Sequence, residues 1–208
     1  MAEYKEHGFS SETPSYLWHY IKQPLLSLLS KQKNTCILDL GCGNGYFVKF
    51  LISQGFNAYG IDASVEGINI AKKTHPDRFF IQDLSENNLP EPIRHLKFDT
   101  VISTEVIEHL YNPFLFMSLC KDILGDTKGD IIISTPYHGY LKNLGLSLFN
   151  KWDKHTNPVA VGGHIKFWSR PTLSRLLTQS GFTVTDFIGC GRYPYLWKSM
   201  IIKARLGQ

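Results

Sequence analysis

The chain passes from an apolar run into a glycine-rich turn at residues 36–45, which read CILDLGCGNG. The run at residues 36–40 has the length and composition of a buried strand, and a helical pattern follows at residues 46–54. Glycines between a strand and a helix let the backbone turn sharply and approach a ligand closely. The segment therefore predicts the first βα unit of a doubly wound sheet, with a candidate ligand site at Gly41, Gly43 and Gly45.

The rest of the chain continues this alternation of strands and helices. Further strands are expected at residues 57–61, 79–81, 98–103, 130–135, 182–189 and 197–204, and further helices at 65–74, 113–124 and 170–180. Such alternation favours right-handed βαβ units and an α/β fold with a mostly parallel sheet. Residues 1–34 form a lead-in, in which a helical stretch at 13–30 is interrupted by Pro24.

The composition is that of an ordinary globular protein, with 208 residues, 43% apolar and 19% charged, and it suits one domain with a substantial core. The net charge of +4 is spread along the chain, so no nucleic acid partner is expected. The four cysteines show no metal-type spacing, which predicts free thiols and a cytoplasmic protein. Neither a signal peptide nor an apolar window of bilayer length is recognisable.

Two further acids follow predicted strands at the same edge of the sheet. Asp62 ends the second strand, twenty-one residues after Gly41, where a carboxylate can accept hydrogen bonds from both hydroxyls of a ribose. Asp83 follows the third strand and could reach an adenine amino group. The alternative is a tight turn without a ligand and two acids that only cap loops. Tyr46 stands where a dinucleotide fingerprint has its third glycine, which disfavours a nicotinamide cofactor.

Four motifs together resemble those of class I S-adenosylmethionine-dependent methyltransferases. They are LDLGCGNG at 38–45, GID at 60–62, QDL at 82–84 and FDTVIS at 98–103, and the resemblance covers residues 36–204. It implies one methyltransferase domain over residues 1–208, a Rossmann-like seven-stranded sheet of order 3-2-1-4-5-7-6, and an antiparallel C-terminal hairpin.

The resemblance also implies S-adenosylmethionine as cofactor, with S-adenosylhomocysteine as product. The glycines would face the methionine part, Asp39 would support its amino group through the loop, and Asp62 would hold the ribose. Asp83 would hold the adenine, and Leu84 would lie against the ring. The full set of expected cofactor-binding residues is Asp39, Gly41, Cys42, Gly43, Gly45, Asp62, Ala63, Asp83, Leu84 and Thr104.

The segment beyond the fourth strand, STEVIEHL at residues 103–110, carries candidate catalytic groups. Glu105, Glu108 and His109 stand at i, i+3 and i+4 and would share one face of a helical turn. His109 is then a candidate general base, because imidazole titrates near neutral pH, with a glutamate orienting it. The alternative is a polar turn in which His109 is only hydrogen-bonded.

EVIEHL, the later STP and HIKFWSRPTL at 164–173 resemble the ubiquinone-biosynthesis-type O-methyltransferase branch. This implies methylation of a small-molecule acceptor at oxygen. His164, which follows the insertion at residues 137–163, is a further candidate catalytic residue beside Glu105, Glu108 and His109. EVIEHL also resembles metal-dependent methyltransferases that modify the terminal ribose of small RNAs. That alternative implies a divalent ion on Glu105, Glu108, His109 and His164. Because the chain has no strong basic patch, methylation of a small molecule without a metal is the first interpretation, and the metal-dependent RNA methyltransferase is the second. A non-catalytic cofactor-binding module is a third.

An insertion at residues 137–163 follows the fifth strand. A helical pattern puts Leu141, Leu144, Leu148, Phe149 and Trp152 on one face and turns Lys142, Asn150 and Lys151 away from it. This face either packs on the domain or belongs to a lid that covers an apolar substrate or touches a membrane surface peripherally. Gly162 and Gly163 could act as the hinge, and closure would bring His164 into the site.

Overall fold

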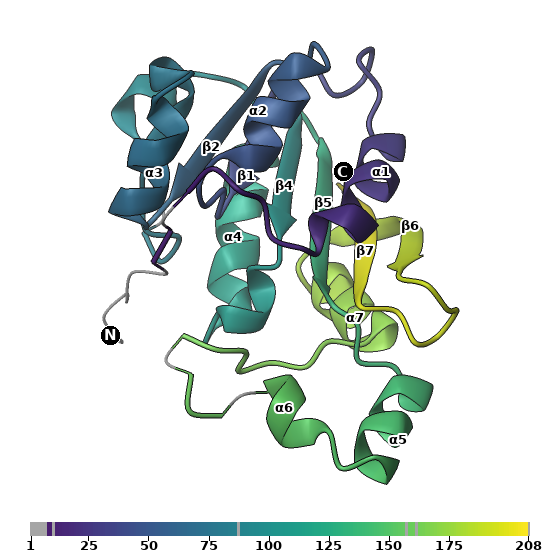
Figure 1. Ribbon diagram of the computed structural model, residues 1–208. Helices are drawn as coiled ribbons and strands as arrows, with labels where there is room; N and C mark the ends of the chain where they lie inside the picture. The colour runs from purple at the N-terminus through teal and green to yellow at the C-terminus, as the bar shows by residue number, and fades with distance from the viewer. Residues whose placement is uncertain (1–7, 10, 87, 157, 161, 208) are drawn as a thin grey trace.

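A computed structural model describes residues 8–9, 11–86, 88–156, 158–160 and 162–207 (Figure 1). This described part contains a seven-stranded sheet of order β3-β2-β1-β4-β5-β7-β6. The strands are β1 (Ile37–Leu40), β2 (Ala58–Asp62), β3 (Phe79–Ile81), β4 (Thr100–Thr104), β5 (Asp130–Pro136), β6 (Phe182–Cys190) and β7 (Ser199–Leu206). β1 to β5 pair in parallel, and β7 runs antiparallel to both β5 and β6. The predicted α/β fold, its strand order and its C-terminal hairpin are confirmed.

Helices cover both faces of the sheet (Figure 1). α1 (Trp18–Ser27), α2 (Tyr46–Ser53) and α3 (Val65–Lys72) share a core with one face, and α4 (Pro113–Leu124) and α7 (Arg170–Gln179) share a core with the other. Because successive strand residues point to opposite faces, Ile37 and Ile102 join the first core and Leu38 and Val101 the second. All four are fully buried, which explains why these strands read as continuous apolar runs.

Local sequence signals set the starts of the helices. α4 begins after Asn112, whose side chain accepts a hydrogen bond from Phe114 N, and Pro113 occupies the first turn. α7 begins with a capping box between Ser169 and Thr172. Three 3₁₀ turns, η1 (Pro76–Arg78), η2 (Glu91–Ile93) and η3 (Ile107–His109), lie in the connections.

The N-terminal lead-in differs from a single long helix. Its helix spans Trp18–Ser27 and contains Pro24, while the residues before it run along the glycine loop. Asn44 Nδ2 donates to the carbonyl oxygens of Ser11, at 2.9 Å, and Thr13, at 3.3 Å. The lead-in is therefore fastened to the predicted ligand loop.

The insertion lies beyond the carboxyl ends of the parallel strands, at the bottom of Figure 1. It forms two helices, α5 (Tyr140–Leu148) and α6 (Trp152–Thr156), rather than one, because Asn150 has φ 49° and interrupts the helix. Leu148 and Phe149 are 72% and 71% exposed, so this end of the apolar face of α5 does not pack on the domain. In the described part of the chain, no helix is long and apolar enough to cross a membrane.

A buried ion pair fastens the C-terminal hairpin to β5. The Asp130 side chain is 3% exposed, and its carboxylate lies 2.7 Å from Arg205 Nε and 3.0 Å from Lys203 Nζ. Burial alone would raise the pKa of Asp130, but hydrogen bonds and charge from Arg205 and Lys203 outweigh it, and the pKa lies below its ordinary value. The ionised form therefore stabilises the sheet.

We expect Asp130→Asn to lower the free energy of unfolding by ~1.5–3 kcal/mol at neutral pH, the range for hydrogen bonds to a charged group. Because folding lowers the pKa of Asp130, its contribution is complete above the unfolded pKa of about 3.9 and is lost as pH falls through the lower folded value. The difference between the two proteins should therefore shrink in acid, as measured by urea unfolding across the pH range. Asp126→Asn is the control, because Asp126 makes only an exposed pair with Lys97 in the described structure. An equal loss in both variants would contradict this account.

Candidate active site

The glycine loop connects β1 to α2 through three left-handed residues. Gly41, Gly43 and Gly45 have φ of 82°, 54° and 75°, a region that side chains other than hydrogen rarely permit. There is also no room for a side chain at two of these positions. A Cβ on Gly45 would lie 2.6 Å from the Ala71 Cβ, and one on Gly41 would lie 2.5 Å from Val106 Cγ2. Val106 directly precedes η3, so the predicted cofactor loop and the predicted catalytic segment are in contact.

Asp62 braces this loop from the end of β2. One carboxylate oxygen accepts from Gly43 N at 2.7 Å and the other from Ser64 N at 2.8 Å. The Asp62 carboxylate, which is predicted to bind the ribose, is thus fixed by two hydrogen bonds at the sheet edge beside the loop. Cys42 is buried, and its Sγ lies beneath Gly60 of β2.

A surface hollow of about 260 Å³ continues from this edge, and Ala63 and Asp83 contribute to its lining. Asp83 Oδ1 also accepts from Ser85 N at 2.8 Å. Leu84 is half-buried against the core, and Thr104, half-buried, ends β4. Of the residues expected to bind the cofactor, Ala63 and Asp83 line this hollow, and Asp62 directly precedes Ala63 in the chain.

Asp39 lies below the loop, 1% exposed, and neither of its side-chain oxygens has a partner among the described residues. Burial, with a smaller effect of Asp62, raises its pKa to about 8. A buried carboxyl group without a hydrogen bond is unfavourable unless a cationic or donating group reaches it. The residues therefore fit a ligand that carries an ammonium group, such as the methionine part of S-adenosylmethionine.

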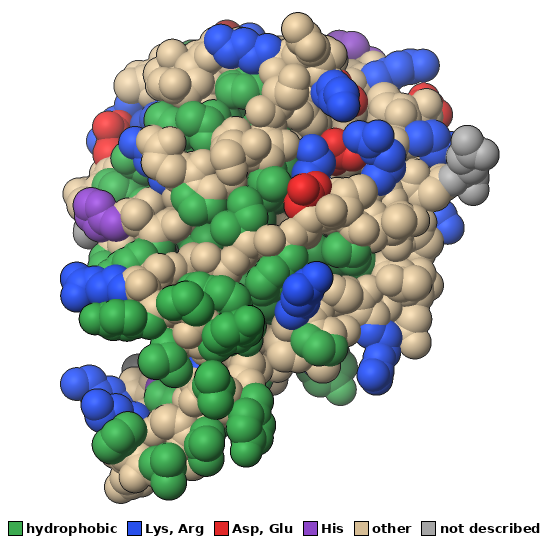
Figure 2. Space-filling view, turned by 90° about the vertical axis from the view of Figure 1, so that its right-hand side faces the viewer, with side chains coloured by type: hydrophobic (Ala, Val, Ile, Leu, Met, Phe, Trp, Pro, Cys, Tyr) green, Lys and Arg blue, Asp and Glu red, His purple; other side chains and the backbone are tan. Residues whose placement is uncertain are grey.

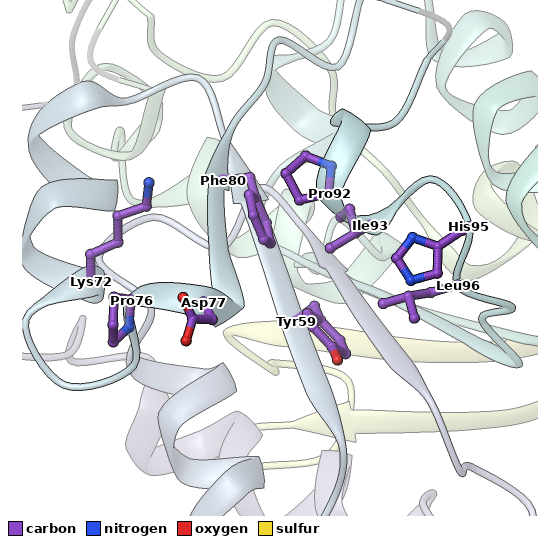
Figure 3. A pocket seen from close by; sticks show the side chains of 9 residues that line it. All are labelled: Tyr59, Lys72, Pro76, Asp77, Phe80, Pro92, Ile93, His95 and Leu96. Carbon is purple, nitrogen blue, oxygen red and sulfur yellow. The ribbon is translucent and has the colours of Figure 1, made fainter.

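A larger hollow, of about 580 Å³, lies elsewhere, between β2, β3 and the η2 turn (Figure 3). The rings of Tyr59 and Phe80 point into it, and His95 lies at its η2 side. None of the residues predicted to act on a cofactor or an acceptor lines it, so its size does not make it the active site.

Glu105 does not share a helical face with Glu108 and His109, and that prediction is wrong. Its φ is 56°, and the 3₁₀ turn begins only at Ile107. The carboxylate turns into the sheet, where Oε1 accepts from Ser134 Oγ at 2.8 Å and Ser199 Oγ at 2.6 Å. Its other oxygen is buried without a partner in the described structure.

Glu108, His109 and His164 converge. Glu108 is 1% exposed; Oε2 accepts from Thr135 Oγ1 at 3.0 Å, while Oε1 has no described partner. That free oxygen lies 3.9 Å from His109 Nε2 and 4.0 Å from His164 Nε2. His164 reaches the site because the N–H groups of Ile165 and Lys166 both donate to the Glu108 carbonyl at 3.0 Å.

The hydrogen bonds of His109 assign its tautomer. Its Nδ1 lies 2.8 Å from the carbonyl oxygen of Gly162 and 3.2 Å from that of Gly163. Carbonyl oxygens only accept, so Nδ1 carries the hydrogen and Nε2 presents a lone pair towards Glu108. The two glycines expected to be a hinge therefore also orient the histidine.

The electrostatics of this cluster disfavour negative charge. Burial, and then the charge of Glu105, raise the pKa of Glu108 well above its usual value. Burial also raises the pKa of Glu105, against hydrogen bonds from Ser199 and Ser134 and the charge of Lys142. His164 is neutral at pH 7, because burial and then His109 lower its pKa to about 4. One ligating atom each from Glu108, His109 and His164 lie within 4.8 Å of one another, an arrangement that suits a divalent cation or a hydroxyl group.

Lys142, His138 and His155 also lie here, and none of them was expected at the site. Lys142 of α5, expected to face away, points inward, and burial lowers its pKa to about 8 although Glu105 opposes the shift. His138 is 5% exposed and meets His155 edge to face, with ring centres 5.1 Å apart, and the Nε2 atoms of both are buried without a described partner. His138 Nδ1 faces Asn143 Oδ1 at 3.2 Å. The position of His138, two residues after the end of β5 at the carboxyl edge of the sheet, was the signal that could have identified it.

The sequence matches the methyltransferase domain family over residues 15–186, which is most of the chain. The chain belongs to this family. The resemblance to class I S-adenosylmethionine-dependent methyltransferases is thereby confirmed.

The chain is also similar to individual relatives and to solved structures. A ubiquinone biosynthesis O-methyltransferase from Cereibacter sphaeroides is 24% identical over 164 residues, 77% of this chain and 65% of the relative. The chain thus spans less than two thirds of that curated relative's length. A chain of the complex between the Haloferax volcanii Trm112 methyltransferase activator and a methyltransferase aligns with TM-score 0.71 and 16% identity, covering 92% and 90% of the two chains. Magnesium protoporphyrin IX methyltransferase from Synechocystis, with bound S-adenosylhomocysteine, aligns with TM-score 0.63 and 19% identity over 90% and 82%.

In this chain, Asp62→Ala should weaken binding of S-adenosylhomocysteine by ~1.5–3 kcal/mol, because a charged hydrogen-bond acceptor is removed. Calorimetric titration measures the change, and circular dichroism checks the fold, since Asp62 also braces Gly43. Asp77→Ala, an exposed acid on η1, is the control. Equal affinities of the Asp62 variant and the wild type would exclude the assignment.

The insertion should open more readily than the sheet, because α5 contains no buried residue. Its amide hydrogens should exchange faster than those of α7, a surface helix of similar length that buries Leu173, Leu176 and Leu177. Exchange in α5 should slow when cofactor and acceptor are both bound. Hydrogen-exchange mass spectrometry measures this, and equal protection of α5 and α7 would make the insertion a fixed wall.

Proposed function

We propose that this methyltransferase transfers a methyl group from S-adenosylmethionine to a hydroxyl oxygen of a small-molecule acceptor. One observation carries the proposal: the buried, unpartnered Oε1 of Glu108 faces Nε2 of His109 and of His164. Val106 packs this segment onto Gly41 of the cofactor loop. The names of the curated relatives support oxygen as the nucleophile.

The bound cofactor supplies an electrophilic methyl group on a sulfonium centre. The protein's contribution is to hold it, with Asp39 accepting from the amino group and Asp62 and Asp83 accepting from ribose and adenine. Because the chemistry resides in the cofactor, the chain must chiefly position the acceptor, exclude water and accept a proton.

The acceptor hydroxyl would donate to the lone pair of His109 Nε2. His109 Nε2 would accept the proton that the hydroxyl loses as its oxygen takes the methyl group, which bound S-adenosylmethionine would supply and so become S-adenosylhomocysteine. The carbonyl oxygens of Gly162 and Gly163 hold Nδ1–H and stabilise the protonated ring. His164 stays neutral and can orient the same hydroxyl.

A specific observation favours a second means of activating the acceptor, a divalent cation. The ligand atoms of Glu108, His109 and His164 lie within 4.8 Å of one another, both imidazoles can present lone pairs, and Glu108 has a free oxygen. These residues would hold the ion, and the second oxygen of Glu105 lies behind them. Such an ion would act as a Lewis acid that lowers the pKa of a bound hydroxyl. The ribose of an RNA is an alternative acceptor for the same residues, whereas a non-catalytic module would need no such cluster.

Methyl-labelled S-adenosylmethionine, incubated with a panel of phenols, catechols and short RNAs, tests the proposal. We expect label on a small-molecule hydroxyl and at least ~100-fold less in Glu108→Gln, comparable to loss of a positioned acid–base group. Glu66→Gln, an exposed glutamate on α3, is the control. Label on RNA alone, or on no acceptor, would refute it.

Chelation separates the two means of activation. If a cation is bound, chelator abolishes activity, Mn²⁺ or Mg²⁺ restores it, and Mn²⁺ titration gives heat with the wild type but not with Glu108→Gln. This result would assign activation of the acceptor to the cation rather than to His109 as a base. If His109 acts alone, as in the mechanism proposed first, chelator has no effect on activity and Mn²⁺ titration gives no heat with the wild type; this is the result we expect.

A further inference from the structure

The apolar side of helix α5 faces outward, away from the domain. No residue of the helix is buried. Its polar side carries Lys142 towards Glu105 and places Asn143 against His138. Contact of so many apolar side chains with water is unfavourable, and exposed apolar patches of this kind mark interaction surfaces.

The exposed apolar residues continue from α5 into the β6–β7 loop and the start of α1. Two contacts connect the insertion region with the β6–β7 loop. Lys142 Nζ lies 3.5 Å from the Lys198 carbonyl oxygen, and the ring centres of Tyr137 and Trp197 are 5.0 Å apart. Lys198 Nζ in turn lies 4.5 Å from the ring centre of Tyr16. We call this set the outer apolar surface; its exposed fractions are Tyr140 78%, Leu141 50%, Leu144 39%, Leu148 72%, Phe149 71%, Tyr193 67%, Tyr195 58%, Leu196 52% and Tyr16 53%.

Basic residues border this surface. Figure 2 shows the face, and its lower half carries apolar side chains and Lys or Arg but no acidic side chain. The segments 140–156 and 191–198 contain five Lys or Arg residues against one acid, Asp153. Four of the five are exposed: Lys151, Lys154, Arg192 and Lys198. Tyrosines and lysines, which bury an apolar body and keep a polar end in water, suit an interface between apolar and charged phases.

The partner must therefore be apolar at the centre and anionic around it. A second copy of the chain fits poorly, because a two-fold contact through this surface would set Lys151 and Lys154 against the basic rim of the other copy. The surface of an anionic bilayer offers acyl chains to the leucines and negative headgroups to the lysines.

We propose that the methyltransferase binds anionic lipid bilayers peripherally through the outer apolar surface, with α5 lying in the interfacial layer. The polar side of α5 then faces the Glu108 site and its apolar side the lipid. That an acceptor dissolved in the bilayer enters by this route rests on the proposed function, whereas bilayer binding does not.

Sedimentation with vesicles tests the proposal. The full chain should bind vesicles of phosphatidylcholine and phosphatidylglycerol, and bind pure phosphatidylcholine far more weakly. Leu148→Ser combined with Phe149→Ser should weaken binding by ~tenfold or more, since it removes two of the most exposed apolar groups. The matched control is Phe114→Ser with Leu115→Ser on α4, which are 51% and 57% exposed outside this surface and should change nothing. Lys151→Glu with Lys154→Glu should abolish the preference for anionic vesicles.

Three results would overturn the proposal: no binding to anionic vesicles at low salt, equal loss in the α4 control, or a dimer that the α5 variant dissociates. The last, measured by light scattering, would assign the surface to a second copy. Binding of S-adenosylhomocysteine and methylation of a water-soluble phenol are measured on the same variants. Absence of methylation with intact vesicle binding would reject the proposed function and leave the bilayer proposal standing.

Discussion

Burial of carboxyl groups that lack partners is the constraint around which this molecule is arranged. Asp39, Glu105 and Glu108 each place at least one oxygen at the carboxyl edge of the sheet without a hydrogen bond from the described residues. Folding raises the pKa of each, so these groups lower stability as pH rises through their ordinary range. A ligand that brings donors or positive charge to this edge offsets that cost and so stabilises the folded chain.

The C-terminal hairpin does more than extend the sheet. Antiparallel pairing places Ser199 of β7 opposite Pro136 of β5, and its hydroxyl reaches Glu105, ninety-four residues away in the chain. Ser134 and Thr135 supply the other hydroxyls, to Glu105 and Glu108 respectively. Two acids are therefore fixed by small hydroxyl side chains from β5 and β7, which leaves their remaining oxygens for a ligand. Asp130 at the far end of β5 secures the same hairpin with a fully paired carboxylate, which shows the contrast between a structural acid and a site acid.

Features set by local pattern were predictable, and features set by packing were not. The glycine turn, the strand-end acids and the helix caps all follow from short-range rules, so the fold and the cofactor edge could be predicted. Glu105 could not, because its left-handed backbone is imposed by the approach of β5 and β7, where the spacing alone suggested a helical turn. The orientation of the helix in the insertion could not be predicted for a different reason. A helical pattern separates two faces but does not say which one turns inward, and here the Glu105 side chain attracts Lys142.

This orientation of α5 sets two interactions against each other. An apolar side chain of leucine size gains roughly 1.5–3 kcal/mol on full burial, so leaving several exposed is a substantial loss in water. Against it stands the attraction between Lys142 and Glu105 in a poorly solvated place, where charges interact more strongly than at a surface. Turning the helix over would bury the leucines but remove the cation from Glu105 and separate Asn143 from His138. The two demands are compatible only if the apolar side meets something other than water. The same helix can then serve the acceptor site with one face and an apolar phase with the other, which makes the insertion the link between the chemistry and its surroundings.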